Sequence, residues 1–171
     1  RYISEHGGKV ITSSRVRAIE SCSNGLHKVV TDRATLESRQ IVLATPPRQT
    51  AQLLSAFTQQ QALADLLQQF EYQPIITIYL QFDEQVQLPQ PFVGFDDSLT
   101  QWLFDRHHSS QPGLMAAVIS SEGEHCDWSR EKITHMVMAE ITARFPELGE
   151  PQKSWLIHEK QATFSATIGI N

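Results

Sequence analysis

The hydrophobic and polar positions of the first fifty residues predict short strands joined by turns. Residues 15–21 form one strand-like run, and the Asn24-Gly25 pair joins it to a second run at residues 26–31. Asn-Gly is a strong two-residue hairpin signal, because both residues tolerate positive φ angles. The continuous apolar residues 41–44 predict a strand that is buried on both faces, and Pro46-Pro47 would end it.

Helical spacing follows this strand-rich segment. Leucines and phenylalanines recur every three or four positions in residues 51–57 and again in residues 63–70, and Thr58 is placed to cap the second helix. Pro74 ends the pattern. Residues rich in β-branched and aromatic types then predict a long strand. An antiparallel meander and a last strand are predicted in the order 75–82, 92–95, 101–104, 114–119 and 155–158.

One amphipathic helix is predicted between the last two strands. Ser129 is a good N-cap residue, and Pro146 ends the helix. The apolar stripe of this helix contains Ile133, Met136, Val137, Ile141 and Phe145. Strands interrupted by a few helices indicate an α+β fold. We expect a mixed, largely antiparallel sheet with helices on one face, together with a small β-hairpin piece.

Composition narrows the classes of protein. The chain has 171 residues, of which 40% are hydrophobic and 19% charged, as in ordinary globular domains. Its net charge of −5 argues against nucleic-acid binding, which requires a basic patch. No apolar run approaches the roughly 18 residues needed to span a bilayer. Because the chain starts at Arg1 rather than Met, we expect it to be a piece of a longer protein.

Several chemical motifs are missing from the sequence. It contains no G-x-G-x-x-G or P-loop, no G-x-S-x-G, no H-E-x-x-H and no paired C-x-x-C. We therefore expect no complete phosphate cradle and no metal site. Cys22 and Cys126 allow either a disulfide or two free thiols in a reducing compartment. The run His125-Cys126-Asp127 holds a thiol beside an imidazole, which suggests either a Cys–His nucleophile or ordinary loop residues.

The order of these motifs resembles a known superfamily. A Gly7-Gly8 pair, a V-x-x-I strand from Val16 to Ile19, the hairpin, and a strand ending in A-T-P-P at residues 44–47 follow one another. This order resembles the middle of flavin-containing amine oxidases, phytoene desaturases and their relatives. The runs W-L-F-D-R (residues 102–106) and A-T-F-S-A-T (residues 162–167) look like one bacterial branch, the hydroxysqualene dehydroxylases of hopanoid synthesis.

The resemblance implies a division of the chain and a cofactor. Residues 1–48 would be part of an FAD-binding domain, residues 49–160 the substrate-binding domain, and residues 161–171 the return toward a further FAD-binding segment. Val16, Ala44, Thr45 and Pro46 would contact FAD in the complete enzyme. The family's glycine-rich phosphate loop is absent from this sequence, so we expect the chain alone not to hold FAD.

The resemblance also implies an apolar substrate. Tyr79, Trp102 and Phe104 are the candidate contacts, on strands facing a cavity. Further wall residues would be Ile75, Ile76, Ile78, Phe92 and Phe95, although such residues also form the core of a sheet. Amine oxidases proper carry a lysine near the flavin where this chain has Thr77, which favours an isoprenoid over an amine.

The catalytic residues are unknown from the sequence. Asp105 and Arg106 are candidates, because a departing hydroxyl needs a proton and an acid beside an apolar cavity can supply it. Alternatively, they form a surface charge pair at the end of a strand.

The expected function is that of a fragment of an FAD-dependent oxidoreductase, which converts hydroxysqualene to squalene when complete. Alternatives are a fragment of a polyene desaturase or an amine oxidase-like flavoenzyme, or a non-enzymatic α+β lipid-binding or scaffold module. We expect a cytoplasmic protein, with peripheral membrane association of the full enzyme. An exposed face of the sheet would be open to dimerisation.

Overall fold

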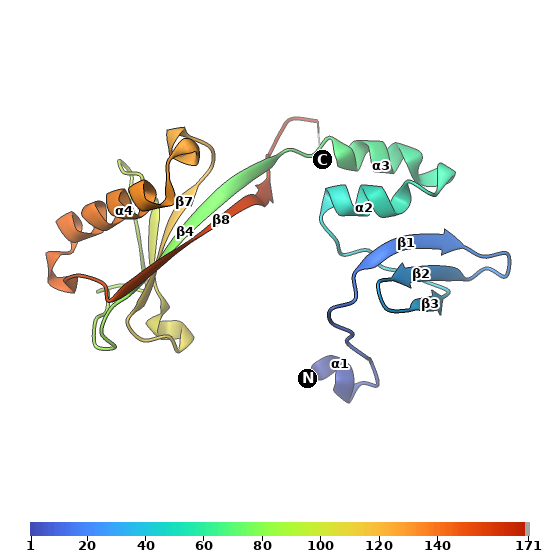
Figure 1. Ribbon diagram of the computed structural model, residues 1–171, viewed down its shortest axis with the longest axis horizontal. Coiled ribbons are helices and arrows are strands. Elements are labelled where there is room, and N and C mark those ends of the chain that lie inside the picture. Colours follow the sequence, from blue (N-terminus) through green and yellow to red (C-terminus); the bar gives the residue numbers. More distant parts are fainter. Residues whose placement is uncertain (170–171) are drawn as a thin grey trace. The chain divides into compact units, whose positions relative to one another are not determined.

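The computed structural model describes residues 1–169. Its internal contacts form two compact units. In Figure 1, residues 1–70 of the first unit run from blue to green and the second unit runs from green to red. Unit 1 comprises Arg1–Phe70 and the described residues from Thr167 on, and unit 2 comprises Glu71–Ala166.

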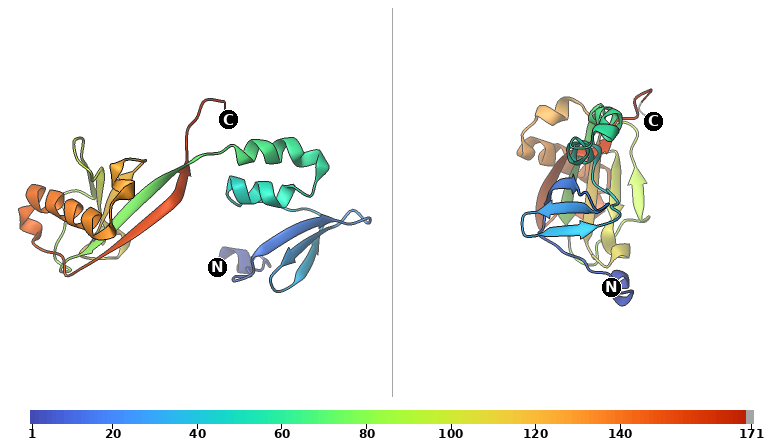
Figure 2. Two further views of the ribbon diagram at one scale, coloured as in Figure 1. Left: turned by 45° about the horizontal axis from the view of Figure 1, so that its top comes forward. Right: turned by 90° about the vertical axis from the view of Figure 1, so that its right-hand side faces the viewer.

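Unit 1 combines a small antiparallel sheet with helices. Its three strands lie in the order β1-β2-β3, and α2 contacts both α3 and β1. Figures 1 and 2 show α2 and α3 side by side. This division differs from the predicted boundary at residues 48/49, because both helices belong with the sheet of unit 1. The elements are α1 (Tyr2–Glu5), β1 (Val16–Ser21), β2 (His27–Thr31), β3 (Thr35–Ser38), α2 (Pro47–Leu54), the 3₁₀ turn η1 (Thr58–Gln60) and α3 (Gln61–Gln68).

The predicted hairpin is present, with a different turn. Asn24 and Gly25 lie in the loop between β1 and β2, and the backbone N–H of Cys22 donates to the Leu26 carbonyl at 2.9 Å. Gly25 has a φ of +74°, whereas Asn24 has a negative φ. Asn24 instead accepts a hydrogen bond from the Leu26 N–H on its side-chain oxygen, at 3.1 Å. It therefore stabilises the turn through its side chain.

Two local predictions in unit 1 are wrong. Residues 41–44 do not form a strand, and Val42 is 91% exposed. A strand needs a neighbour to satisfy its backbone groups, and no described strand lies beside these residues. Ile41 and Leu43 are half-buried and line an apolar pocket instead. Thr58 begins the turn η1 without a capping hydrogen bond, and Gln60 occupies the N-cap position of α3.

Unit 2 is built on a five-stranded antiparallel sheet in the order β5-β6-β7-β4-β8. The predicted α+β class is confirmed, and β5, β6 and β7 form the predicted antiparallel meander. Strand β4 does not lie beside β5, as the predicted meander required, but pairs with β7 and β8. Strand β8 extends to Phe164, which pairs with Tyr72, so residues 161–164 belong to this sheet. Residues 170–171 of the predicted return segment lie outside the described residues. The elements are β4 (Tyr72–Gln81), β5 (Phe92–Gly94), β6 (Trp102–Asp105), β7 (Leu114–Ser120), α4 (Arg130–Arg144), β8 (Lys153–Phe164), and the 3₁₀ turns η2 (Arg106–Ser109), η3 (Glu124–Asp127) and η4 (Pro146–Leu148).

The core of unit 2 lies between α4 and one face of the sheet, and Figures 1 and 2 show α4 alongside the strands. Alternate residues of each strand point to this face. Ile76 and Ile78 are at most 1% exposed, so their predicted place in a substrate wall is wrong. Phe95 is also packed against the core. The largest fully buried hydrophobic side chains are Ile76, Ile78, Leu80, Leu103, Met115, Ile119 and Val137.

Helix α4 begins as predicted, at Ser129, whose hydroxyl accepts a hydrogen bond from the Lys132 N–H at 3.2 Å. Hydrogen bonds to its own backbone N–H and to Ser129 lower the pKa of Glu131 in the first turn. Ile133, Val137 and Ile141 are buried, but Met136 is 38% exposed, so its predicted burial is wrong. In this turn of the helix, Val137 is the buried residue, and the partly buried Met138, rather than Met136, packs against the core.

Within residues 1–169, no helix has the length and apolar character needed to cross a bilayer. Cys22 and Cys126 are both free thiols, which agrees with one of the two predicted alternatives.

Candidate functional site

The face of the sheet opposite α4 exposes large aromatic side chains. On β6, Trp102 is 43% and Phe104 is 37% exposed, whereas the alternating Leu103 and Asp105 are buried. Monomeric soluble proteins rarely leave a contiguous apolar surface uncovered unless it binds something. This side of the sheet is therefore the candidate functional site.

The strand register arranges these side chains in two rows across the sheet. The first row runs across all five strands through Phe92, Phe104, Ala116, Tyr79 and Trp155. The second row is adjacent and runs through Gly94, Trp102, Val118, Thr77 and Ile157. We call the surface made by these two rows the aromatic face. Neither row contains a charged side chain.

The aromatic rings of this face are packed against one another at both edges of the sheet. On β5 and β6, the Phe92 and Phe104 centroids are 6.0 Å apart, and those of Trp102 and Phe104 are 6.2 Å apart. At the other edge, Tyr79 and Trp155 stack with centroids 5.6 Å apart and an interplanar angle of 18°. Such contacts fix the rings and leave apolar surface outward. The structure thus places all three predicted substrate contacts, Tyr79, Trp102 and Phe104, on the same face of the sheet.

Asp105 and Arg106 do not lie on the aromatic face. Asp105 points to the opposite side of the sheet and is 7% exposed. Its two carboxylate oxygens accept hydrogen bonds from the backbone N–H groups of Leu88, at 2.9 Å, and His107, at 2.8 Å. The Arg106 Nε donates to the Gln111 side-chain oxygen at 3.0 Å. Both side chains hold loops in place, and this geometry does not support the catalytic hypothesis for them.

The predicted cofactor contacts lie in unit 1. Val16 begins β1 and is 36% exposed, next to a register shift between Val16 and Ala18. Ala44 and Thr45 are exposed, and Pro46 precedes the first residue of α2. The Thr45 and Thr50 hydroxyls are hydrogen-bonded at 2.8 Å. The segment 44–46 therefore presents backbone and small side chains to its surroundings, as contact with a flat ligand requires.

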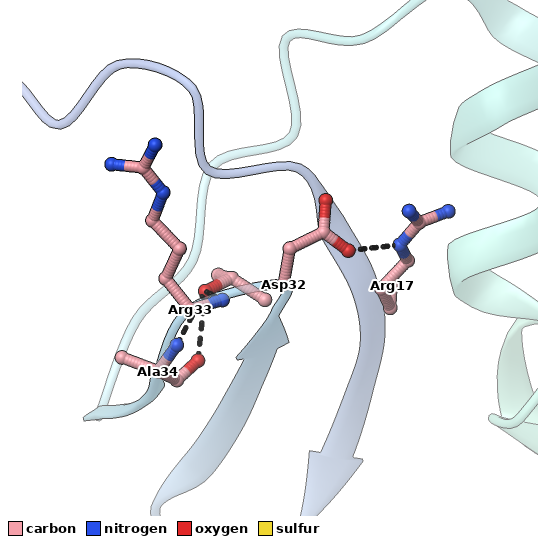
Figure 3. Close-up of polar contacts among 5 residues, drawn as sticks. Arg17, Asp32, Arg33 and Ala34 are labelled. Carbon is pink, nitrogen blue, oxygen red and sulfur yellow. Dashed lines mark hydrogen bonds and ion pairs between the residues drawn. The ribbon is translucent and has the colours of Figure 1, made fainter.

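Polar contacts order the end of the hairpin beside Val16. Figure 3 shows the Arg17 guanidinium paired with the Asp32 carboxylate. The Thr31 hydroxyl accepts hydrogen bonds from the Arg33 N–H, at 3.2 Å, and the Ala34 N–H, at 3.0 Å. It donates to the Ala34 carbonyl at 2.8 Å. These bonds shape the turn between β2 and β3 and leave the Arg33 side chain pointing away from it (Figure 3).

Sequence reasoning missed five residues of the aromatic face, which are Gly94, Ala116, Val118, Trp155 and Ile157. Trp155 and Ile157 belong to β8, where Trp155, Leu156 and Ile157 form an unbroken apolar run that does not show which residues face outward. Only pairing with β4 decides this, because Tyr79 lies opposite Trp155 and Thr77 opposite Ile157. Gly94 was missed because glycine has no side chain from which a substrate contact could be predicted.

Comparison with known proteins agrees with this architecture. The family model described as "Flavin containing amine oxidoreductase" matches residues 1–161. The chain is 26% identical over 127 residues to hydroxysqualene dehydroxylase of Sinorhizobium fredii, an alignment that covers 74% of this chain. Cyclohexylamine oxidase from Brevibacterium oxydans is similar in structure, with a TM-score of 0.65 at 14% identity over 86% of this chain. A fatty acid isomerase from P. acnes that produces CLA has a TM-score of 0.58 at 12% identity over 84% of this chain.

The chain spans only part of each of these proteins. It covers 27% of the dehydroxylase, and 34% of both the cyclohexylamine oxidase and the fatty acid isomerase. At these identities the two structural matches show a shared fold.

Proposed function

The chain belongs to the family of flavin-containing amine oxidoreductases, and from this membership we propose that it forms the substrate-binding part of an FAD-dependent oxidoreductase acting on a long isoprenoid. The reaction we propose for the complete protein is the reductive dehydroxylation of hydroxysqualene to squalene. The name of the dehydroxylase relative supports this reaction.

The aromatic face is the observation that most directly supports a long isoprenoid chain as the substrate class. Its two rows span five strands, and their polar side-chain groups are the hydroxyls of Tyr79 and Thr77 and the indole N–H groups of Trp102 and Trp155. Strand neighbours lie about 4.8 Å apart, so the rows offer roughly 19 Å of continuous apolar surface. An uncharged, extended hydrocarbon matches such a surface better than a small polar amine does.

Thr77 supports the same substrate class. It lies in the second row, paired with Val118 on one side and Ile157 on the other. The resemblance described above aligns it with the lysine that amine oxidases proper carry near the flavin. A neutral hydroxyl at the centre of an apolar face leaves the surface without charge and suits an isoprenoid chain.

The residues of unit 1 fit a partial cofactor site. The exposed backbone around Val16 and residues 44–46 is accessible to a flat ligand, whereas the sequence contains no glycine-rich loop for the pyrophosphate. Val16, Ala44, Thr45 and Pro46 would thus hold one part of FAD. When bound, the reduced cofactor would supply the hydride that replaces the hydroxyl group of the substrate. The departing hydroxide would take up one proton and leave as water.

The part of unit 2 in this reaction is to bind the chain and exclude water. Tyr79, Trp102 and Phe104 would contact the hydrocarbon, and Phe92 and Trp155 would extend the contact to the two edges of the sheet. When substrate covers this face, apolar surface is removed from water, and each Å² of it stabilises the complex by about 25 cal/mol.

The test uses the complete FAD-loaded protein that carries this chain. The flavin is reduced by light under anaerobic conditions and mixed with hydroxysqualene. Return of the visible flavin absorbance, with squalene detected by mass spectrometry, is the expected result. A Trp102→Ala/Phe104→Ala variant should lose this reaction while it retains bound FAD.

The alternatives give different outcomes in the same apparatus. Bleaching of the oxidised flavin by an amine would show an amine oxidase, and bleaching by an isoprenoid with fewer double bonds than the polyene product would show a desaturase. A protein that binds the lipid but does not bind FAD would be a lipid-binding module. Each of these results would overturn the proposed dehydroxylation.

A further inference from the structure

Strand β8 is a long, open edge of the sheet in unit 2. The sheet ends at β5 on one side and at β8 on the other, so each of these pairs with a described strand on one side only. Strand β5 has three residues, whereas β8 has 12 and contains neither proline nor glycine. Figures 1 and 2 show β8 running along β4. Short length and proline commonly protect an edge strand, and a long edge without them offers backbone N–H and C=O groups to another strand.

The part of β8 from Lys153 to Glu159 is regular. Its residues pair one for one with β4, and the register shift between Gln73 and Ile75 comes after Glu159. Because side chains alternate across a strand, the residues of this part divide between the two sides of the sheet. Lys153, Trp155, Ile157 and Glu159 lie on the side of the aromatic face, and Ser154, Leu156 and His158 lie on the side of α4.

This part of β8 is complementary to a second copy of itself. When two copies pair antiparallel about Leu156, Leu156 lies opposite its own counterpart, and Trp155 lies opposite Ile157 of the partner subunit. Lys153 then lies opposite Glu159 of the partner subunit, and the two-fold symmetry makes this contact twice. Opposite-charge pairs directly across two strands stabilise the pairing, and like-charge pairs oppose it.

Other registers of this part of β8 lack the charge match. Registers that place odd-numbered residues opposite even-numbered ones would turn the aromatic face of one copy toward the α4 side of the other. The nearest registers that keep the faces aligned are centred on Trp155 or on Ile157. The first places Lys153 opposite Ile157, and the second places Trp155 opposite Glu159. The register centred on Leu156 is the one of these three that joins opposite charges at both ends.

The two charged residues are accessible for this contact. Lys153 and Glu159 are both exposed, and no ion pair among the described residues involves β8. The Glu159 Oε1 accepts a hydrogen bond from the Gln161 N–H at 3.1 Å, which holds the carboxylate at the end of the regular part. Its other oxygen is free to accept a charged donor from across the edge.

We propose that β8 pairs with β8 of a second copy, in the register centred on Leu156, to form a symmetric dimer with one continuous sheet. The two rows of the aromatic face then continue from Trp155 and Ile157 into the rows of the partner subunit. The pairing uses the edge of the sheet and leaves the aromatic face open. It therefore differs from the dimer expected from the sequence, which would form through that face, and it does not depend on the proposed function.

Charge reversal tests the register. Sedimentation equilibrium of the 1–171 chain measures the dissociation constant of the dimer. Lys153→Glu and Glu159→Lys each place like charges opposite each other twice, so each should raise this constant about 10-fold or more. Lys160→Glu is a matched charge reversal on the same strand, beyond the regular part, and should change it by less than about threefold.

Restoring the opposite charges provides the second test. In a mixed dimer of Lys153→Glu with Glu159→Lys, both contacts again join opposite charges, so the mixture should dimerise within about threefold of the wild type. The chain that carries both reversals should do the same on its own. Circular dichroism and urea unfolding check that each variant is folded. Folded variants that do not recover dimerisation in the mixture or in the double variant would overturn the proposed register.

Two further results would overturn the proposal. One is a wild-type chain that remains monomeric at millimolar concentration. The other is a dimer that charge reversal does not weaken but that squalene or Trp102→Ala/Phe104→Ala dissociates, because such a dimer would form through the aromatic face. A β8 dimer should persist in the presence of squalene whether or not squalene binds, so failure of lipid binding would count against the proposed function alone.

Discussion

The Asp105 carboxylate on β6 accepts a hydrogen bond from the backbone N–H of Leu88, 2.9 Å away in the loop that leads to β5. Its other oxygen accepts from the His107 N–H at 2.8 Å. A buried carboxylate that joins two loops in this way is a structural group, because both of its oxygens are occupied by backbone donors.

Asp105→Ala should therefore destabilise the fold. It leaves the Leu88 and His107 N–H groups without their acceptor, which costs about 1–3 kcal/mol for a buried group. Asp105→Asn should cost less, because one oxygen remains. Urea unfolding measures both variants. An Asp105→Ala variant as stable as the wild type would show that these hydrogen bonds do not contribute to the free energy of unfolding. It would contradict the structural role given to Asp105 and support a test of the catalytic hypothesis.

Glu140 is expected to have a similar role on α4. Its carboxylate accepts hydrogen bonds from the backbone N–H groups of Leu99, at 2.8 Å, and Thr100, at 2.9 Å. Glu140→Ala should lower the free energy of unfolding by about 1–3 kcal/mol. The exposed Glu150→Gln serves as the control and should change it by less than about 0.5 kcal/mol. Equal effects of the two changes would contradict the role of Glu140 in holding the loop before β6.

The two sides of α4 differ in their predicted response to truncation. Ile141 is 3% exposed, so Ile141→Ala should cost about 2–5 kcal/mol. Met136 is 38% exposed, and Met136→Ala should cost less than about 1 kcal/mol. Thermal and urea unfolding of the two variants provide the comparison. A larger loss from Met136→Ala would mean that the helix is rotated about its axis.

Ser129→Ala should remove the N-cap of the same helix, at a cost of about 0.5–2 kcal/mol. It should also raise the pKa of Glu131 toward its ordinary value, because Ser129 is one of the two hydrogen-bond partners that lower it. A lowered carboxyl pKa adds stability above the unfolded-state pKa, and this stability is lost as the pH falls through the folded-state value. NMR titration of Glu131 in both proteins measures the shift. An unchanged Glu131 pKa in the variant would contradict this account of the cap.

The purified 1–171 chain should carry no flavin. The residues that fit FAD, Val16 and residues 44–46, lack a glycine-rich loop to hold the pyrophosphate, which supplies much of the binding in dinucleotide sites. Visible absorbance of the purified chain and calorimetric titration with FAD test this. A yellow preparation with one FAD per chain would contradict it.

Local signals in the sequence predicted most of the elements. The Asn24-Gly25 pair located the first hairpin, Ser129 the start of α4, and the apolar run from Trp102 to Phe104 the strand β6. These signals succeed because they act between residues close in the chain. The strand predicted at residues 41–44 is absent, because an apolar run becomes a strand only beside a partner strand. Among the described residues, no strand lies beside this segment.

The candidate site was predicted only in part, because strand register decides which side chains share a face. Tyr79 and Ile78 are neighbours in sequence, yet one lies on the aromatic face and the other in the core. Trp155 joined the site through its pairing with Tyr79, a contact between residues 76 positions apart in the numbering. Asp105 looked like a surface acid, and its loop contacts came from a segment that the sequence did not connect to it.

Binding of an isoprenoid chain to the aromatic face is the property that most directly tests the proposed function. The measurement is a squalene titration of the 1–171 chain followed by tryptophan emission, with putrescine as the polar control. The chain has three tryptophans, and two of them, Trp102 and Trp155, lie on the aromatic face. A Trp102→Phe/Trp155→Phe variant retains Trp128, which packs against the core, as its reporter.

Squalene should shift the wild-type emission to shorter wavelength in a saturable manner, because the exposed indoles move into an apolar environment. The double variant should show no shift, and putrescine should change neither protein. No response to squalene in the wild type, or the same response in the double variant, would contradict binding at the aromatic face.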